Sequence, residues 1–200
     1  MRQLFYVIWA AAVCAATTAW ACACCTDPGQ RLEQIVTLDQ GILDEVQRIR
    51  FAPSARLLAD PGFPDSVKGV SRPSGGAYRV RLQLSGRALR FDVVDPEGRA
   101  GAITLALPRR MTRFEVDPRL EAPSSNHGPT LYKEWQIAGA ANLSGIFEAG
   151  RGQPQARLVL HGQGNTCTTA DDFAHWTLKV TGAGAAFSFL GDIVRDGSVR

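Results

Sequence analysis

The feature that most constrains the fold is a hydrophobic period of two that starts near residue 78 and recurs almost to the C-terminus. In each such segment apolar residues alternate with polar ones, as in a strand with one buried and one wet face. The alternating segments are 78–84, 89–93, 103–107, 114–116, 131–137, 146–147, 156–160, 176–180 and 187–190. The pattern predicts a mostly β protein, a single antiparallel β-sandwich or up-and-down barrel of about eight or nine strands.

The phase of the alternation predicts which side chains form the core. Apolar residues that share one face of a strand are expected to be buried together. Trp176 is in phase with Leu178, which predicts a buried indole, whereas His161 and His175 fall on the opposite, outer faces of their strands. The expected core positions are Leu82, Leu84, Phe91, Val93, Leu105, Leu158, Leu160, Trp176 and Leu178.

One short N-terminal helix departs from this pattern. Apolar residues recur at helical spacing from Ile42 to Ile49, directly after Asp39, whose side chain suits an N-cap. The helix is expected to reach about Arg50 and to end at Phe51-Ala52-Pro53. A short strand is expected at 55–58, and a loop rich in proline and glycine follows it.

The first residues have the pattern of a signal peptide. Arg2 precedes an apolar segment at 4–13, and small residues surround the cleavage positions after Ala21 and Ala23. An uncleaved anchor at 4–20 is shorter than a usual membrane span. We therefore expect export to the periplasm or cell envelope.

Cleavage after residue 21 leaves one β-rich domain at 22–200, with no transmembrane span in the mature chain. A lipid anchor at Cys22 or Cys24 is less favoured, because alanine occupies the position three residues upstream where such signals usually carry leucine. The formal charge is +3, and the basic residues are scattered singly. Because no basic stripe is present, nucleic acid is not an expected partner.

The cysteines of the mature chain admit two interpretations. Cys22, Cys24 and Cys25 form a Cys-Ala-Cys-Cys cluster, and Cys167 lies far from it in the sequence. In an oxidising compartment we expect a disulfide between the cluster and Cys167. The alternative is a thiolate site for Cu(I) or Zn, built from Cys24, Cys25 and Cys167 with His161 or His175. The cluster lacks the usual zinc-knuckle spacing, which favours the disulfide.

The stretch from His161 to Trp176 concentrates the chemically distinctive residues. Two alternating strands flank it, so it is expected to be the long connection of a hairpin that displays Asn165, Asp171 and Asp172 as a binding loop. A thiol enzyme would use Cys167 as nucleophile and His175 as base, oriented by one of the aspartates. The simpler interpretation is that the aspartates cap a local turn, and we assign no catalytic residue.

The Cys-Ala-Cys-Cys cluster, Leu131-Tyr-Lys-Glu-Trp135 and the Gly-x-Gly-Asn-x-Cys-x-x-Ala-Asp-Asp-Phe-x-His-Trp-x-Leu pattern at 162–178 resemble a family of exported bacterial proteins with no established activity. The resemblance extends over most of the mature chain and implies export. It implies no catalytic or binding residues.

Three classes of function are compatible with these residues. The first, which we favour because it requires nothing unusual of them, is an exported, non-enzymatic β-domain that binds a small apolar ligand or an envelope protein partner. The second is a periplasmic metal-handling protein based on the cysteines and histidines. The third is the thiol-dependent enzyme. The sequence specifies no cofactor.

Overall fold

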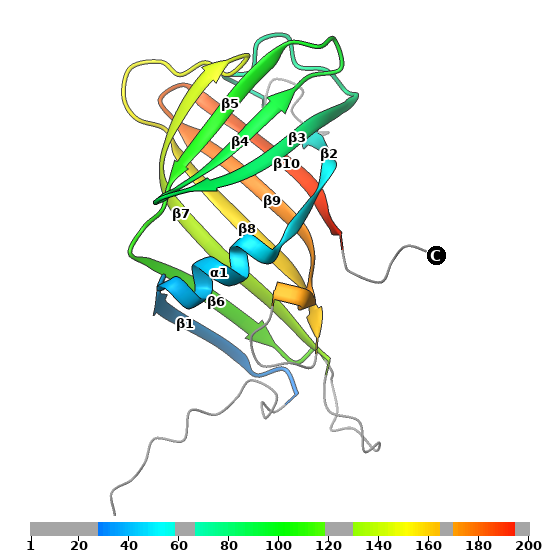
Figure 1. Ribbon diagram of the computed structural model, residues 1–200, viewed down its shortest axis with the longest axis vertical. Coiled ribbons are helices and arrows are strands. Elements are labelled where there is room, and N and C mark those ends of the chain that lie inside the picture. The colour runs from blue at the N-terminus through cyan, green and yellow to red at the C-terminus, as the bar shows by residue number, and fades with distance from the viewer. Residues whose placement is uncertain (1–27, 59–66, 119–129, 165–169, 195–200) are drawn as a thin grey trace, which may run out of the picture.

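The computed structural model describes residues 28–58, 67–118, 130–164 and 170–194. Ten strands, one α-helix and a 3₁₀ turn make up this part of the chain (Figure 1). The strands are β1 (Arg31–Thr37), β2 (Arg50–Leu58), β3 (Ala77–Ser85), β4 (Ala88–Val94), β5 (Ala100–Ala106), β6 (Arg110–Val116), β7 (Leu131–Gly145), β8 (Gln155–Gly164), β9 (Phe173–Gly182) and β10 (Ala185–Val194). The helix is α1 (Gln40–Arg48), and the 3₁₀ turn is η3 (Ala170–Asp172).

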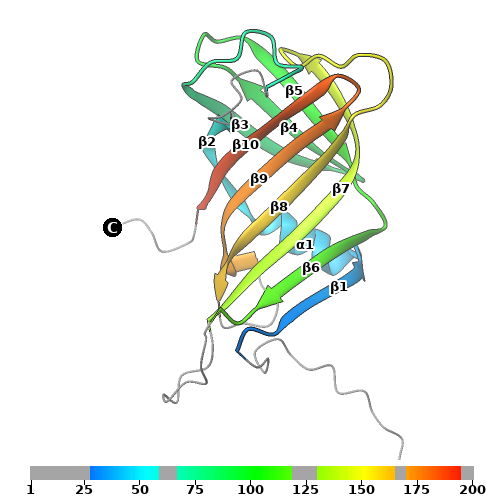
Figure 2. The same cartoon turned by 180° about the vertical axis from the view of Figure 1, so that it is seen from behind.

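Eight of these strands close into an antiparallel up-and-down barrel. Around the ring, β2 is followed by β3, β4, β5, β7, β8, β9 and β10, and β10 pairs with β2. The long strand β7 has two neighbours on one edge: its first half pairs with β6 and its second half with β5. β1 pairs with β6, so these two strands extend the wall at one end of the barrel (Figure 2). The mostly β barrel expected from the sequence is confirmed.

The expected helix is present and covers the end of the barrel between the β1–β6 pair and β2 (Figure 1). Asp39 is its N-cap, and the Asp39 Oδ1 atom accepts a hydrogen bond of 3.0 Å from the backbone N–H of Ile42. Ile42, Leu43 and Val46 are buried in the same core cluster as the strand residues. The helix therefore closes part of the barrel end with its apolar side.

The barrel interior is filled by apolar side chains. Trp176 is fully buried, and its ring centroid lies 5.7 Å from that of Phe51 and 5.9 Å from that of Phe91. The expected core positions are buried except Leu82 and Leu84, which remain partly exposed although they pack against the core. The sequence phase was therefore correct, and these two leucines mark a place where the wall is incomplete.

Two strand predictions were wrong in their bounds. β2 begins at Arg50 and contains Pro53, which was expected to end the helix in a non-strand segment. The strand accommodates this proline because the register with β10 shifts beside it and pairing with β3 begins only at Ser54. Ile146 and Phe147 do not form a separate strand. They directly follow the long strand β7, which ends at Gly145.

β1 was not expected at all. Its residues are mostly exposed, and it pairs with only one neighbour, β6, so its sequence lacks the alternation of a half-buried strand.

None of the helices among the described residues is long and apolar enough to cross a membrane. The cysteines and Asn165 lie outside the described residues.

Candidate functional site

A groove opens into the barrel wall where β2 and β3 part. These strands pair over only three positions, Ser54 to Arg56 on β2, so the first half of β2 has no partner on that side. The groove has a volume of about 630 Å³. Its lining residues come from α1, β2, β3 and β4 and their junctions: Val46, Gln47, Ile49, Arg50, Phe51, Pro53, Val80, Arg81, Leu82, Leu84 and Leu89. The two incompletely covered core leucines thus lie in the groove.

The groove has charged residues in its lining. Arg50 and Arg81 are exposed and line it, and none of the lining residues in the described part of the chain is acidic. Its remaining wall is largely aliphatic and aromatic, and Leu89 and Val46 at its base are buried. Such a groove can hold an apolar group and attract a negative charge at its rim.

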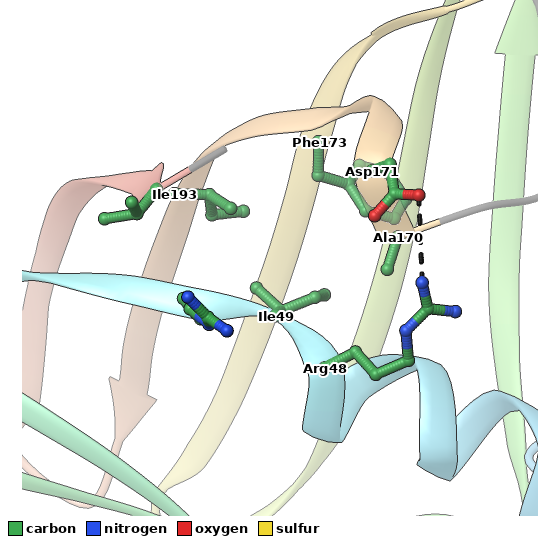
Figure 3. Close-up of a pocket in the computed structure, with 8 residues that line it drawn as sticks. Arg48, Ile49, Ala170, Asp171, Phe173 and Ile193 are labelled. Atoms are coloured by element: carbon green, nitrogen blue, oxygen red, sulfur yellow. Dashed lines mark ion pairs between the residues drawn. The ribbon is translucent and has the colours of Figure 1, made fainter. Parts of the chain in front are cut away.

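A second recess lies on the other side of the α1–β2 junction and shares Ile49 and Arg50 with the groove. It has a volume of about 410 Å³, and Phe173 and Ile193 contribute apolar walls (Figure 3). Arg48 and Asp171 face each other across it, with 3.8 Å between Nη2 and Oδ2 (Figure 3). Both side chains are exposed, so this ion pair contributes little to stability.

The position of η3 beside this recess is determined by contacts to α1 and to the barrel interior. Glu45 on α1 accepts a hydrogen bond of 3.0 Å from the backbone N–H of Ala170, and it also pairs with Arg48. Inside the barrel end, Lys133 Nζ lies 2.5 Å from Asp172 Oδ2, and both side chains are largely buried. A Cβ atom on Gly164 would collide with the Asp172 carboxylate, so this position requires glycine.

Further charged groups surround this buried pair. Glu115 on β6 is the cross-strand neighbour of Lys133 and is itself buried. Burial raises the pKa of Glu115 above its usual value, and the positive charge of Lys133 only partly offsets this effect. Arg113 stacks over the ring of Trp135, with 5.3 Å from Cζ to the ring centroid. These groups form a structural polar cluster at the barrel end under α1.

The outer face of the barrel brings the two histidines together. His161 on β8 and His175 on β9 are cross-strand partners, and their ring centroids lie 5.6 Å apart. Asp192 on β10 holds His175, with 2.8 Å between Oδ1 and Nδ1. Burial, and then the neighbouring His175, lower the pKa of His161. The pairing of two imidazoles on outer faces agrees with the strand phase expected from the sequence.

The two predicted loop aspartates make different contacts. Asp172 points to the interior and pairs with Lys133, whereas Asp171 is exposed at the recess. The carboxylate partner of His175 is Asp192 on β10, not an aspartate of this loop. The structure therefore gives the proposed thiol triad no orienting acid from this loop, and Cys167 lies outside the described residues.

The disulfide residues Cys22, Cys24, Cys25 and Cys167 likewise lie outside the described ranges, so their pairing stays a prediction. Across the described ranges, no group of three or more histidine, cysteine, aspartate and glutamate side chains is placed to hold a metal ion. The cysteine ligands of the predicted metal site lie outside these ranges, so that part of the prediction stays untested.

Sequence reasoning missed the groove and the buried charges. The sequence phase assigned Leu82 and Leu84 to the core. Nothing in their own segment indicates that β2 does not pair beside them, which is why they remain partly exposed. Lys133 did give a signal, because it is in phase with three apolar residues of its segment.

Comparisons with family models, curated proteins and solved structures found no match to this chain.

Proposed function

We propose that the chain is an exported, non-enzymatic binding protein that holds a small amphipathic molecule, with an apolar tail and an anionic headgroup, in the groove between β2 and β3. The observation that carries this proposal is the parting of β2 from β3, which leaves an apolar groove of about 630 Å³. That volume lies within the range of small-molecule sites.

The composition of the groove supports an amphipathic ligand. Each methylene group that moves from water into the groove beside Leu82 and Leu84 contributes about 0.8 kcal/mol of binding free energy. Arg81 supplies positive charge at the rim, and a carboxylate or phosphate there gains charge-assisted hydrogen bonds. A neutral apolar molecule would gain only the first of these contributions.

A protein partner is the less supported form of the same function. The large apolar side chains that are exposed among the described residues are Ile35, Leu58 and Val194, on β1, β2 and β10. Leu58 and Val194 lie at opposite ends of the β2–β10 pairing. Apolar residues scattered in this way are normal on a protein surface and do not form an interface patch.

Calorimetric titration of the purified mature protein with decanoate and with the neutral alcohol 1-decanol tests the proposal. The variant Leu84→Trp places a larger side chain in the groove lining, so decanoate affinity should fall at least about tenfold, equivalent to about 1.4 kcal/mol. Leu58→Trp is the control, because it makes the same change at an exposed strand leucine that does not line the groove. Arg81→Gln should weaken decanoate binding and leave decanol binding unchanged.

The proposal is wrong if decanoate does not bind, or if Leu84→Trp and Leu58→Trp bind it equally well. Equal loss of decanoate and decanol binding in Arg81→Gln would contradict the role of charge while leaving the apolar groove in place.

Export is part of this proposal and rests on the pattern at 1–21. When the full-length chain is expressed in a bacterium, the intact mass of the periplasmic protein should correspond to a chain that starts at Cys22 or Cys24. Measured with and without reductant, the same mass also reports lipid attachment and disulfides. Recovery of uncleaved protein from the cytoplasm and from no other fraction would contradict export.

A further inference from the structure

The barrel strands β7, β8, β9 and β10 lie side by side (Figure 2). The strand register aligns a row of polar residues across these four strands. The register places Glu134 opposite His161, His161 opposite His175, and His175 opposite Asp192. The row therefore has a carboxylate at each end and two imidazoles in the middle. None of these residues lines the groove or the recess at the barrel end.

A local irregularity opens space beside the two histidines. Between His161 and Gly162 the register with β9 shifts, so that Ala174 is an extra residue on β9. Such a bulge changes the direction of neighbouring side chains, and it often lies next to a functional site. A hollow of about 420 Å³ lies beside this bulge, with His161, His175 and Ala174 in its lining.

Both imidazoles are held in position by neighbours. His175 uses Nδ1 for its contact with Asp192, which leaves Nε2 as its other ring nitrogen. A carboxylate bound to one ring nitrogen in this way fixes the orientation of a metal-binding histidine and makes its other nitrogen a better donor. His161 lies between two rings, with its centroid 6.5 Å from that of Tyr132 and 5.6 Å from that of His175.

The spacing of the rings suits a shared metal ion. A nitrogen-to-metal bond of about 2.0–2.1 Å places each imidazole centroid about 3.2 Å from the metal, so two rings on one ion have centroids roughly 5–6 Å apart. The observed separation is 5.6 Å. Glu134 lies beside the pair, and its two carboxyl oxygens accept hydrogen bonds from Tyr132 and Gln136.

We propose that His161 and His175 form a surface site for one divalent transition-metal ion, held by two imidazole nitrogens and completed by water. Imidazole donors select such ions over magnesium and calcium, which prefer oxygen. Copper(II) forms the strongest complexes in this class and is the best probe. The site is independent of the groove, so failure of ligand binding there leaves this proposal unaffected.

The test is titration of the mature protein with copper(II), monitored by electron paramagnetic resonance and by competition with glycine for the metal. We expect one copper(II) per chain with two nitrogen donors from the protein. His175→Asn and His161→Asn should each remove one nitrogen from the spectrum and lower the affinity at least about tenfold. Asp192→Asn keeps both donors and should weaken binding about 10–100-fold through the lost orientation of His175.

His127→Asn is the matched control, since it removes the third histidine of the chain and should leave the spectrum and affinity unchanged. The side chain of His175 is 52% exposed, so His175→Asn preserves the fold and carries the test even where His161→Asn does not fold. A copper spectrum that persists unchanged in His175→Asn would overturn the proposal, as would a sulfur-to-copper charge-transfer band or no binding at all.

Discussion

Gly191 on β10 shows how closely single residues are fitted into the barrel. It lies opposite Trp176, and a Cβ atom at this position would approach three atoms of the indole to 2.5 Å. The indole cannot move away readily, because it packs between Phe51 and Phe91 in the core. The burial of Trp176 could be predicted from its phase, but the need for glycine opposite it could not, because glycine carries no hydropathy signal.

Gly191→Ala should therefore lower the free energy of unfolding by about 1–3 kcal/mol, the usual cost of overpacking a core. Urea unfolding followed by far-UV circular dichroism measures this change. Gly75→Ala is the matched control, because a Cβ atom there meets nothing within 4 Å. Equal stability of the two variants would show that the indole does not lie against β10.

Among the buried charges, the inward direction of Lys133 could be predicted from the sequence, but its partner could not. Lys133 shares the alternation of a core-facing segment, which indicates its direction. Its partner Asp172 is 39 positions away along the chain, and glycine at position 162 of β8 leaves room for the Asp172 backbone to approach. Pairing at that separation depends on the closed sheet and leaves no pattern in either segment.

At the scale of elements, the helix and the strands with two neighbours were predicted correctly from local sequence patterns. β1 and the first half of β2 were not. α1 was predictable because its N-cap and its apolar spacing lie within a few residues of each other. The strands β3, β4 and β8 have neighbours on both sides and one buried face, so they alternate clearly. β1 pairs on one edge, and β2 contains a proline, so both depart from the pattern that sequence reading relies on.

The two proposed sites also arise at this scale, from irregular pairing between elements. The groove exists because β2 and β3 pair over three positions, and the outer hollow exists because β8 and β9 shift register. Register depends on contacts between distant strands. The sequence did indicate that both histidines face outward, but it did not indicate that Asp192 would hold one of them.

At the scale of the whole molecule, the sequence could not distinguish a sandwich from a barrel, because both consist of alternating strands. The distinction depends on the pairing of β2 with β10 and of β7 with β8, which closes the ring. Closure leaves one end to α1, and α1 covers it only in part. The groove lies where α1 meets the half of β2 that does not pair with β3.

The most direct test of this account is nuclear magnetic resonance of methyl-labelled protein in the presence of decanoate. We predict nuclear Overhauser contacts between the alkyl chain of decanoate and the methyl groups of Leu82 and Leu84, and none to Leu58 or Ile35 on other parts of the surface. Contacts to Leu58 or Ile35 without contacts to Leu82 and Leu84, or none to any methyl group, would contradict the groove as the binding site.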